Sequence, residues 1–236
     1  MLINFTFAIQ SLFCIFALLS FMLSTFCFFN NQNNGLLFLV ISIFNLLVAL
    51  LAKIFDRKFK NDAARILKYL FLIWFVLILL SAMPLLTLKD NISLNEALFL
   101  ATSFITTTGF SIQSVSVNNS LELQLWRAII QIIGANYTII INIIVISMII
   151  SKENKTILLN RRSIYQFHLL FFSFLFIYFF FLTMFNKSII ENFLVSSAIL
   201  SSGGLIDVDT HILRYELSSN KMLSILSFLM IINLFI

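Results

Sequence analysis

The sequence predicts an all-α integral membrane protein, in which an N-terminal helix pair precedes two units of helix, re-entrant pore loop and helix. Hydrophobic residues make up 61% of the 236 residues and charged residues only 11%, whereas soluble domains carry roughly a quarter charged residues. Several apolar runs reach the roughly 20 residues that a helix needs to cross a bilayer. Two further apolar runs are too short to cross and end in polar turns that contain glycine.

Six apolar runs are expected to be spans, and the first is long enough to be a retained helix rather than a removed signal peptide. Pro84 is expected to bend or end the third span. The expected spans are 3–29, 36–54, 69–88, 123–150, 163–185 and 221–236. They divide the chain into a helix pair with a basic loop (1–68), a first helix–pore loop–helix unit (69–150) and a second unit (151–236) whose last helix is cut short.

The two short apolar runs, 95–105 and 189–200, are expected to enter the membrane and turn back. The polar segment that ends at Ser93 is suited to capping a helix that starts near Leu94. After this run, the threonines at 106–108 are compatible with an extended backbone, and Gly109 permits the positive φ of a carbonyl-lined turn. The partial negative charge at the C-terminal end of such a helix favours a cation.

The basic residues predict the orientation of the chain. The segments 53–68 and 151–163 carry ten of the fifteen Lys and Arg residues, which places both in the cytoplasm. Both can lie there only if each short run enters and leaves through the outer face. Segment length and charge therefore agree on two re-entrant loops and on a cytoplasmic N-terminus.

The two units repeat at a fixed offset of 95 positions. Glu96 corresponds to Glu191, and Gly109 corresponds to Gly204. A parallel repeat in a membrane protein implies rotation about an axis along the membrane normal, with the polar turns meeting at that axis. Turns that meet at an axis are the geometry of an ion filter.

Four stretches resemble the potassium-uptake proteins of the TrkH/KtrB family. NEALF at 95–99 and TTTGF at 106–110 are similar to the first pore loop of that family, and LWRAIIQIIG at 125–134 is similar to the start of the helix that follows it. LSSGGL at 200–205 resembles the second pore loop. The matches keep the order and spacing of the family and cover essentially the whole chain.

The resemblance implies a potassium pathway in a bacterial inner (plasma) membrane, in which backbone carbonyls replace the hydration shell of K⁺. It also implies four loops around the ion, so a second chain would supply two of them, and a cytoplasmic nucleotide-binding ring as partner. The lipid bilayer and K⁺ are the other expected partners, with no nucleic acid and no cofactor. By position, the filter residues are Thr107, Thr108, Gly109, Phe110, Ser202, Gly203, Gly204 and Leu205.

The chain departs from the family in three places. It has two loops, and its last helix stops at Ile236. Leu205 stands where the family has an aromatic residue. The helix after the first loop has GANY at 134–137 instead of a Gly-Gly-Met-Gly run, and we therefore expect looser packing there.

Three charged residues are candidates to support the pore loops. Glu96 and Glu191 would lie in the first turn of the short helices, where a carboxylate suits the helix dipole. Arg127 is either a charge at the lipid–water interface, next to Trp126, or a partner of Glu96 or Glu122 that braces the loop.

Several polar residues have simpler interpretations. His168 is expected to pack between helices rather than to relay protons, and Asn136 and Asn142 are expected to form hydrogen bonds between helices. Cys14 and Cys27 are expected to form neither a disulfide nor a metal site. No catalytic constellation is recognisable, so we expect no enzyme activity.

Two other functions remain open. The first is a non-conducting remnant or half-subunit that needs a second chain, because two of four loops are missing. An unrelated secondary transporter with broken helices would place the two polar turns between repeats of opposite topology.

Overall fold

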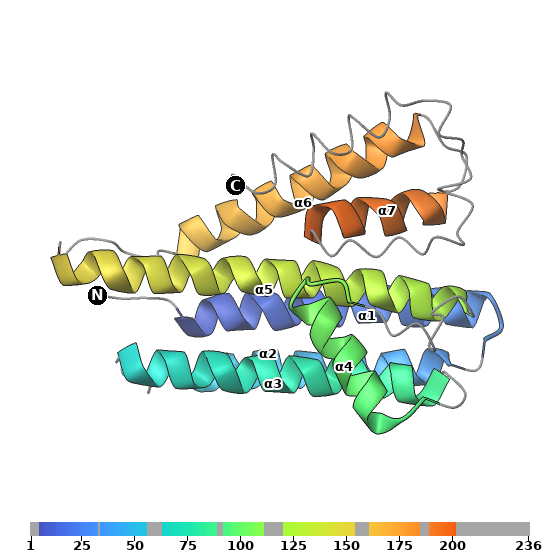
Figure 1. The fold of residues 1–236 in the computed structure, drawn as a ribbon, viewed down its shortest axis with the longest axis horizontal. Coiled ribbons are helices and arrows are strands. Elements are labelled where there is room, and N and C mark those ends of the chain that lie inside the picture. The colour runs from blue at the N-terminus through green and yellow to red at the C-terminus, as the bar shows by residue number, and fades with distance from the viewer. Residues whose placement is uncertain are drawn as a thin grey trace.

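A computed structural model of the chain describes residues 5–32, 34–55, 63–88, 92–110, 120–153, 161–184 and 189–201. These residues form α-helices joined by short connections, and they contain no strand (Figure 1). The helices are α1 (Phe5–Phe29), α2 (Gly35–Phe55), α3 (Ala63–Leu88), α4 (Leu94–Ile105), α5 (Leu121–Glu153), α6 (Arg161–Thr183) and α7 (Ile189–Ser201).

Five of the described helices, α1, α2, α3, α5 and α6, are long and apolar enough to cross a membrane. They coincide with the first five predicted spans, which confirms an all-helical membrane protein. Helices α4 and α7 are the two short apolar runs, of 12 and 13 residues. The predicted sixth span, 221–236, lies outside the described residues.

Helix α3 differs from its prediction at its start and at Pro84. It begins at Ala63, six residues before the predicted start at 69, and it continues through Pro84 to Leu88. The prediction that Pro84 could end the helix is wrong. Pro84 has no N–H and therefore leaves the carbonyl four residues earlier, that of Leu80, without its helical donor, and membrane helices tolerate this loss where the surrounding structure accommodates it.

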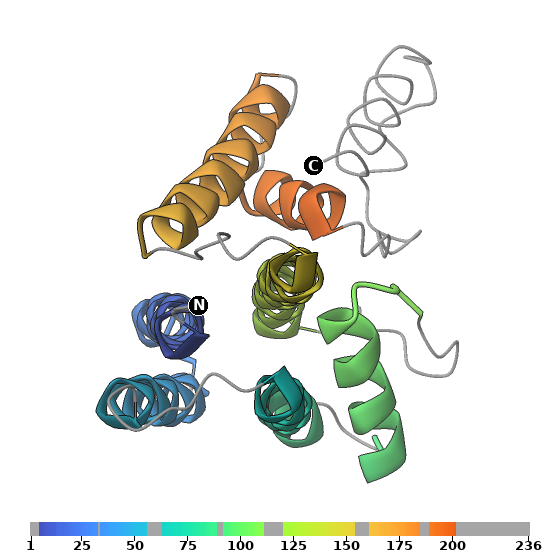
Figure 2. The same cartoon turned by 90° about the vertical axis from the view of Figure 1, so that its left-hand side faces the viewer.

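Helix α5 occupies the centre of the bundle, in contact with α1, α3, α4 and α7 (Figure 2). Trp126 on α5 is fully buried. Its ring lies 5.7 Å from that of Phe16 on α1 and 5.4 Å from that of Phe38 on α2. Its Nε1 donates to the Ser81 carbonyl of α3 at 3.1 Å, so this one side chain joins four helices.

Two hydrogen bonds fix α5 against α3 in an antiparallel register. Trp126 donates to the Ser81 carbonyl, and the Tyr137 hydroxyl donates to the Leu70 carbonyl. The two donors are eleven residues apart on α5 and the two acceptors eleven residues apart on α3, in the opposite order. The same opposite directions are visible in Figure 1.

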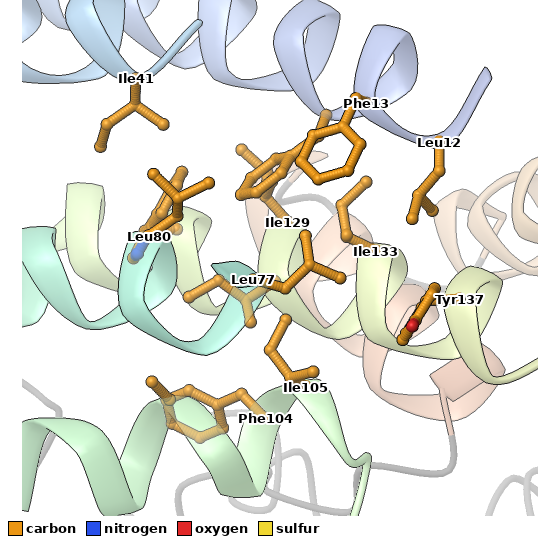
Figure 3. Packing of buried hydrophobic residues seen from close by; sticks show 14 of the residues in the cluster. Leu12, Phe13, Ile41, Leu77, Leu80, Phe104, Ile105, Ile129, Ile133 and Tyr137 are labelled. Atoms are coloured by element: carbon orange, nitrogen blue, oxygen red, sulfur yellow. The ribbon is translucent and has the colours of Figure 1, made fainter. Parts of the chain in front are cut away.

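The buried side chains form one large cluster and two small ones. The large cluster extends across α1 to α5, where Leu77 lies among residues of α4 and α5, including Ile105 and Ile133 (Figure 3). A second cluster joins α6 to α7 and consists of Tyr178, Leu182, Val195 and Ile199. A third, made of Ile132, Ala135 and Phe171, joins α5 to α6.

The short helix α4 begins at Leu94 with a cap at Ser93, as expected, and this cap is a full capping box. Ser93 is the N-cap, its hydroxyl accepts from the Glu96 N–H at 3.3 Å, and the Glu96 carboxylate accepts from the Ser93 N–H at 2.8 Å. Twelve residues at 1.5 Å each give α4 a length of about 18 Å. This is too short to cross the roughly 30 Å of hydrocarbon in a bilayer.

Gly134 on α5 permits the closest approach between α4 and α5. Ile105 is the last residue of α4, and a Cβ atom at position 134 would lie 2.3 Å from its carbonyl oxygen. No side chain fits there, because the obstructing atoms belong to the backbone. The expectation of looser packing at 134–137 is therefore wrong at Gly134.

We predict that Gly134→Ala lowers the free energy of unfolding by about 2 kcal/mol, the usual cost of overpacking a buried contact. Thermal unfolding in detergent, followed by circular dichroism, measures this change. Gly35→Ala is the matched control, because its Cβ would meet only the side-chain ring of Phe28, at 3.1 Å. Equal loss of stability in both variants would contradict the prediction.

Candidate functional site

The C-terminal end of α4 closes in a Schellman motif. The Thr107 N–H donates to the Phe104 carbonyl at 3.2 Å, and the Thr108 N–H donates to the Ser103 carbonyl at 3.1 Å. These bonds satisfy carbonyls that the helix would otherwise leave open. The polar run after α4 is therefore a tight cap on its own helix.

Thr107 occupies the left-handed position of this motif, with φ of 57°. Glycine is the usual residue there, because a Cβ in this conformation costs about 1–2 kcal/mol. The prediction of an extended backbone is wrong for Thr107. The prediction of a positive φ at Gly109 is confirmed, at 71°. A strained β-branched residue is a feature that occurs preferentially at functional sites.

Side-chain hydrogen bonds hold the cap in place. The Ser103 hydroxyl donates to the Phe110 carbonyl at 2.8 Å. The Thr108 hydroxyl donates to the Ser103 carbonyl at 3.3 Å, and the hydroxyls of Thr106 and Thr108 lie 3.1 Å apart. The hydrogen bonds of Ser103 with Phe110 and Thr108 therefore join the segment 106–110 to the last turn of α4.

The carbonyls of Thr106, Thr107, Thr108 and Gly109 accept no hydrogen bond from any residue between 5 and 201 that the structure describes. They follow the C-terminal end of α4, where the helix dipole adds partial negative charge. Oxygen atoms of this kind are the ligands of alkali and alkaline-earth cations in proteins. The chemistry available here is cation coordination by main-chain oxygens.

A cavity of about 490 Å³ lies between the ends of the two short helices. Thr107 lines it from the tip of α4, and Ser201 lines it from the last residue of α7. Thr138 and Asn142 add polar groups from α5. Its remaining walls are mainly apolar side chains of α5 and α6, with Leu200 of α7. The residues before the two predicted filter glycines therefore face one shared space.

The structure places only part of the predicted filter. Thr107 lies on the cavity, Gly109 is half-buried and Phe110 is 66% exposed. Thr108 is exposed and belongs to the cap. The second predicted segment, Ser202, Gly203, Gly204 and Leu205, lies outside the described residues.

The predicted support residues take different positions. Glu96 completes the capping box of α4, and Glu191 lies in the first turn of α7, as expected from the helix dipole. Arg127 is only 6% exposed. That burial rules out the interpretation of Arg127 as a charge at the lipid–water interface.

The sequence did not indicate that one face of α5 lines this cavity. Ala135, Thr138 and Asn142 line the cavity, and their spacing of three and four residues is that of one helix face. The expectation that Asn142 bonds another helix is wrong, since its side chain is exposed on the cavity. Asn136 is fully buried, and its amide has no hydrogen-bond partner within the described part of the chain.

Cys14 and Cys27 are free thiols. The described residues contain no group of three or more His, Cys, Asp or Glu side chains that would hold a metal ion. No protein-family model matches the chain, and no curated protein matches its sequence.

We predict that Thr107→Gly raises the free energy of unfolding by about 1 kcal/mol, because glycine adopts the left-handed conformation without strain. Thr108→Gly is the matched control. Thr108 has a negative φ and a hydroxyl bonded to Ser103, so its replacement lowers stability by about 1 kcal/mol. Thermal unfolding of both variants in the same detergent measures the difference, and destabilisation by Thr107→Gly would contradict the prediction.

Proposed function

We propose that this chain forms part of a potassium-uptake pathway of the TrkH/KtrB type. The observation that carries the proposal is the shared cavity, because Thr107 and Ser201 bring the C-terminal ends of both short helices to one space. Thr107 is the first residue of the first predicted filter segment, and Ser201 directly precedes the second, which starts at Ser202. A single cation between them would meet partial negative charge from two helices.

The chemistry of the α4 cap favours an alkali cation. The cavity-lining groups at the helix ends are hydroxyls and carbonyls, and no carboxylate is found among the described residues that line it. Neutral oxygens suit a weakly hydrated monovalent ion that must both bind and leave. The sequence resemblance of residues 95–110, 125–134 and 200–205 to the pore loops supports potassium.

The helix directions support a re-entrant path for α4. Helices α3 and α5 are antiparallel, and α4 between them is about 18 Å long. A third full crossing would make α3 and α5 parallel. The starts of α1, α3 and α6 lie at the same end of the bundle in Figure 1, beside the basic segments, which supports a cytoplasmic N-terminus.

Two loops enclose only half of a fourfold site. A second chain is the partner that would complete it, and a cytoplasmic nucleotide-binding ring is the partner implied by the family resemblance. The family resemblance also implies a bacterial inner membrane as the location. Under this proposal the chain is a transport protein and not an enzyme.

We predict that the chain restores growth at limiting potassium in an uptake-deficient bacterial host, with co-expression of a second chain that carries two such loops. Gly109→Ser is expected to reduce the preference for K⁺ over Na⁺ by about tenfold, or about 1.4 kcal/mol. A side chain at φ of 71° strains the filter turn. Radiotracer uptake of Rb⁺ and Na⁺ measures the preference.

Gly35→Ser controls for the introduction of a serine elsewhere, since Gly35 begins α2 and does not line the cavity. It is expected to keep the preference of the parent chain. Equal ion preference in Gly109→Ser and the parent would contradict the proposed filter. Absence of any uptake with a partner chain present would favour a non-conducting protein.

A further inference from the structure

A second and larger cavity lies between α1 and α6. Its volume is about 1100 Å³, and it shares only Leu170 with the lining of the first cavity. From α1 it is lined by Phe7, Gln10, Ser11, Cys14 and Ile15, and from α6 by residues 161, 162, 165, 166, 168–170, 172 and 173. We call this cavity the α1–α6 groove.

One end of the groove is basic. Arg161 and Arg162 are the first two residues of α6, and the first turn contains no acidic residue. The Arg161 guanidinium carbon lies 5.3 Å from the centre of the Phe7 ring, and Phe7 in turn contacts Tyr165 edge-on at 5.1 Å. Two positive charges at the positive end of a helix dipole favour an anion. Because α6 is a membrane span, its first turn lies near the headgroup region.

The middle of the groove contains polar groups and the other end is apolar. The Ser11 hydroxyl and Nε2 of His168 lie 2.8 Å apart. His168 is 7% exposed, and its Nδ1 has no hydrogen-bond partner within the described helices. Of the two ring nitrogens of His168, only Nε2 therefore has the interhelical partner expected of a packing residue. Beyond it, the walls are apolar side chains such as Ile15, Leu169 and Phe172.

We propose that the α1–α6 groove binds an anionic phospholipid. The phosphate would lie on Arg161 and Arg162, whose planar guanidinium groups match phosphate oxygens, and an acyl chain would lie along the apolar walls. A basic pocket between membrane helices is the recognised setting for anionic headgroups. A soluble anion would leave the apolar walls uncovered, whereas an anionic lipid matches both these walls and the positive charge that Arg161 and Arg162 place at the headgroup end of the groove.

The first test compares lipid retention by the whole chain in nanodiscs that contain equal amounts of phosphatidylglycerol and phosphatidylcholine. Native mass spectrometry counts the lipids that remain bound after release. The parent chain is expected to retain more phosphatidylglycerol than phosphatidylcholine. In the double variant Arg161→Gln/Arg162→Gln, this enrichment is expected to fall about tenfold. The double variant Arg161→Lys/Arg162→Lys keeps the charge and is expected to lose less.

Lys53→Gln/Lys68→Gln removes the same charge from exposed residues of α2 and α3 outside the groove. This variant is expected to keep the enrichment within about twofold, because diffuse attraction to anionic lipid contributes equally to both double variants. Equal loss in the arginine and lysine variants would overturn the proposal. Equal retention of both lipids by the parent chain would overturn it as well.

A second readout locates the acyl chain and does not depend on retention. Cys14 is exposed and lines the groove, whereas Cys27 is buried, so a bimane label attaches selectively to Cys14. Phosphatidylglycerol with brominated acyl chains is expected to quench this label several times more strongly than brominated phosphatidylcholine. The arginine variant is expected to abolish the difference. The lipid assignment would be overturned if the difference in quenching persisted in the arginine variant, or if it disappeared when inorganic phosphate was added.

Discussion

The backbone contact between Gly134 and Ile105 is the constraint on which the rest of the structure depends. Lipid chains are as apolar as the helices, so burial of apolar surface does not drive membrane helices together, and close packing and hydrogen bonds must do so. A missing Cβ at Gly134 lets the end of α4 rest directly on α5. The position of the end of α4 determines the position of Thr107, and therefore which residues face the cavity. Trp126 and Tyr137 then hold α5 against α3 at two points, so the backbone of α4 meets a fixed surface.

Much of the fold was predictable because its signals are local. Five span positions follow from apolar length, and the start of α4 follows from the spacing of Ser93 and Glu96, which satisfies backbone groups within one turn. The passage of α3 through Pro84 was not predictable, because whether a membrane helix continues past a proline depends on its neighbours in the packed bundle. The burial of Arg127 depends on tertiary neighbours in the same way.

The candidate site was predictable in position more than in conformation. The glycine at 109 indicated a positive φ, and the structure has it. The left-handed Thr107 was not predictable, since a β-branched residue disfavours that conformation and only the completed cap imposes it. Thr138 and Asn142 line the cavity because of the way α7 packs against α5. Polar residues on one helix face have several possible partners, so the sequence alone did not indicate this position.

The packing of the bundle is unequal on the two sides of α5. Helices α1 to α5 share one continuous cluster, to which α6 adds only Ile164 among the described residues, whereas the middle of α6 meets α5 at the small patch of Ile132, Ala135 and Phe171. Ala135 and Phe171 also line the cavity that Thr107 and Ser201 face. A sliding of α6 and α7 across this patch would therefore move Ser201 relative to Thr107, and the width of the cavity between the two helix ends would change.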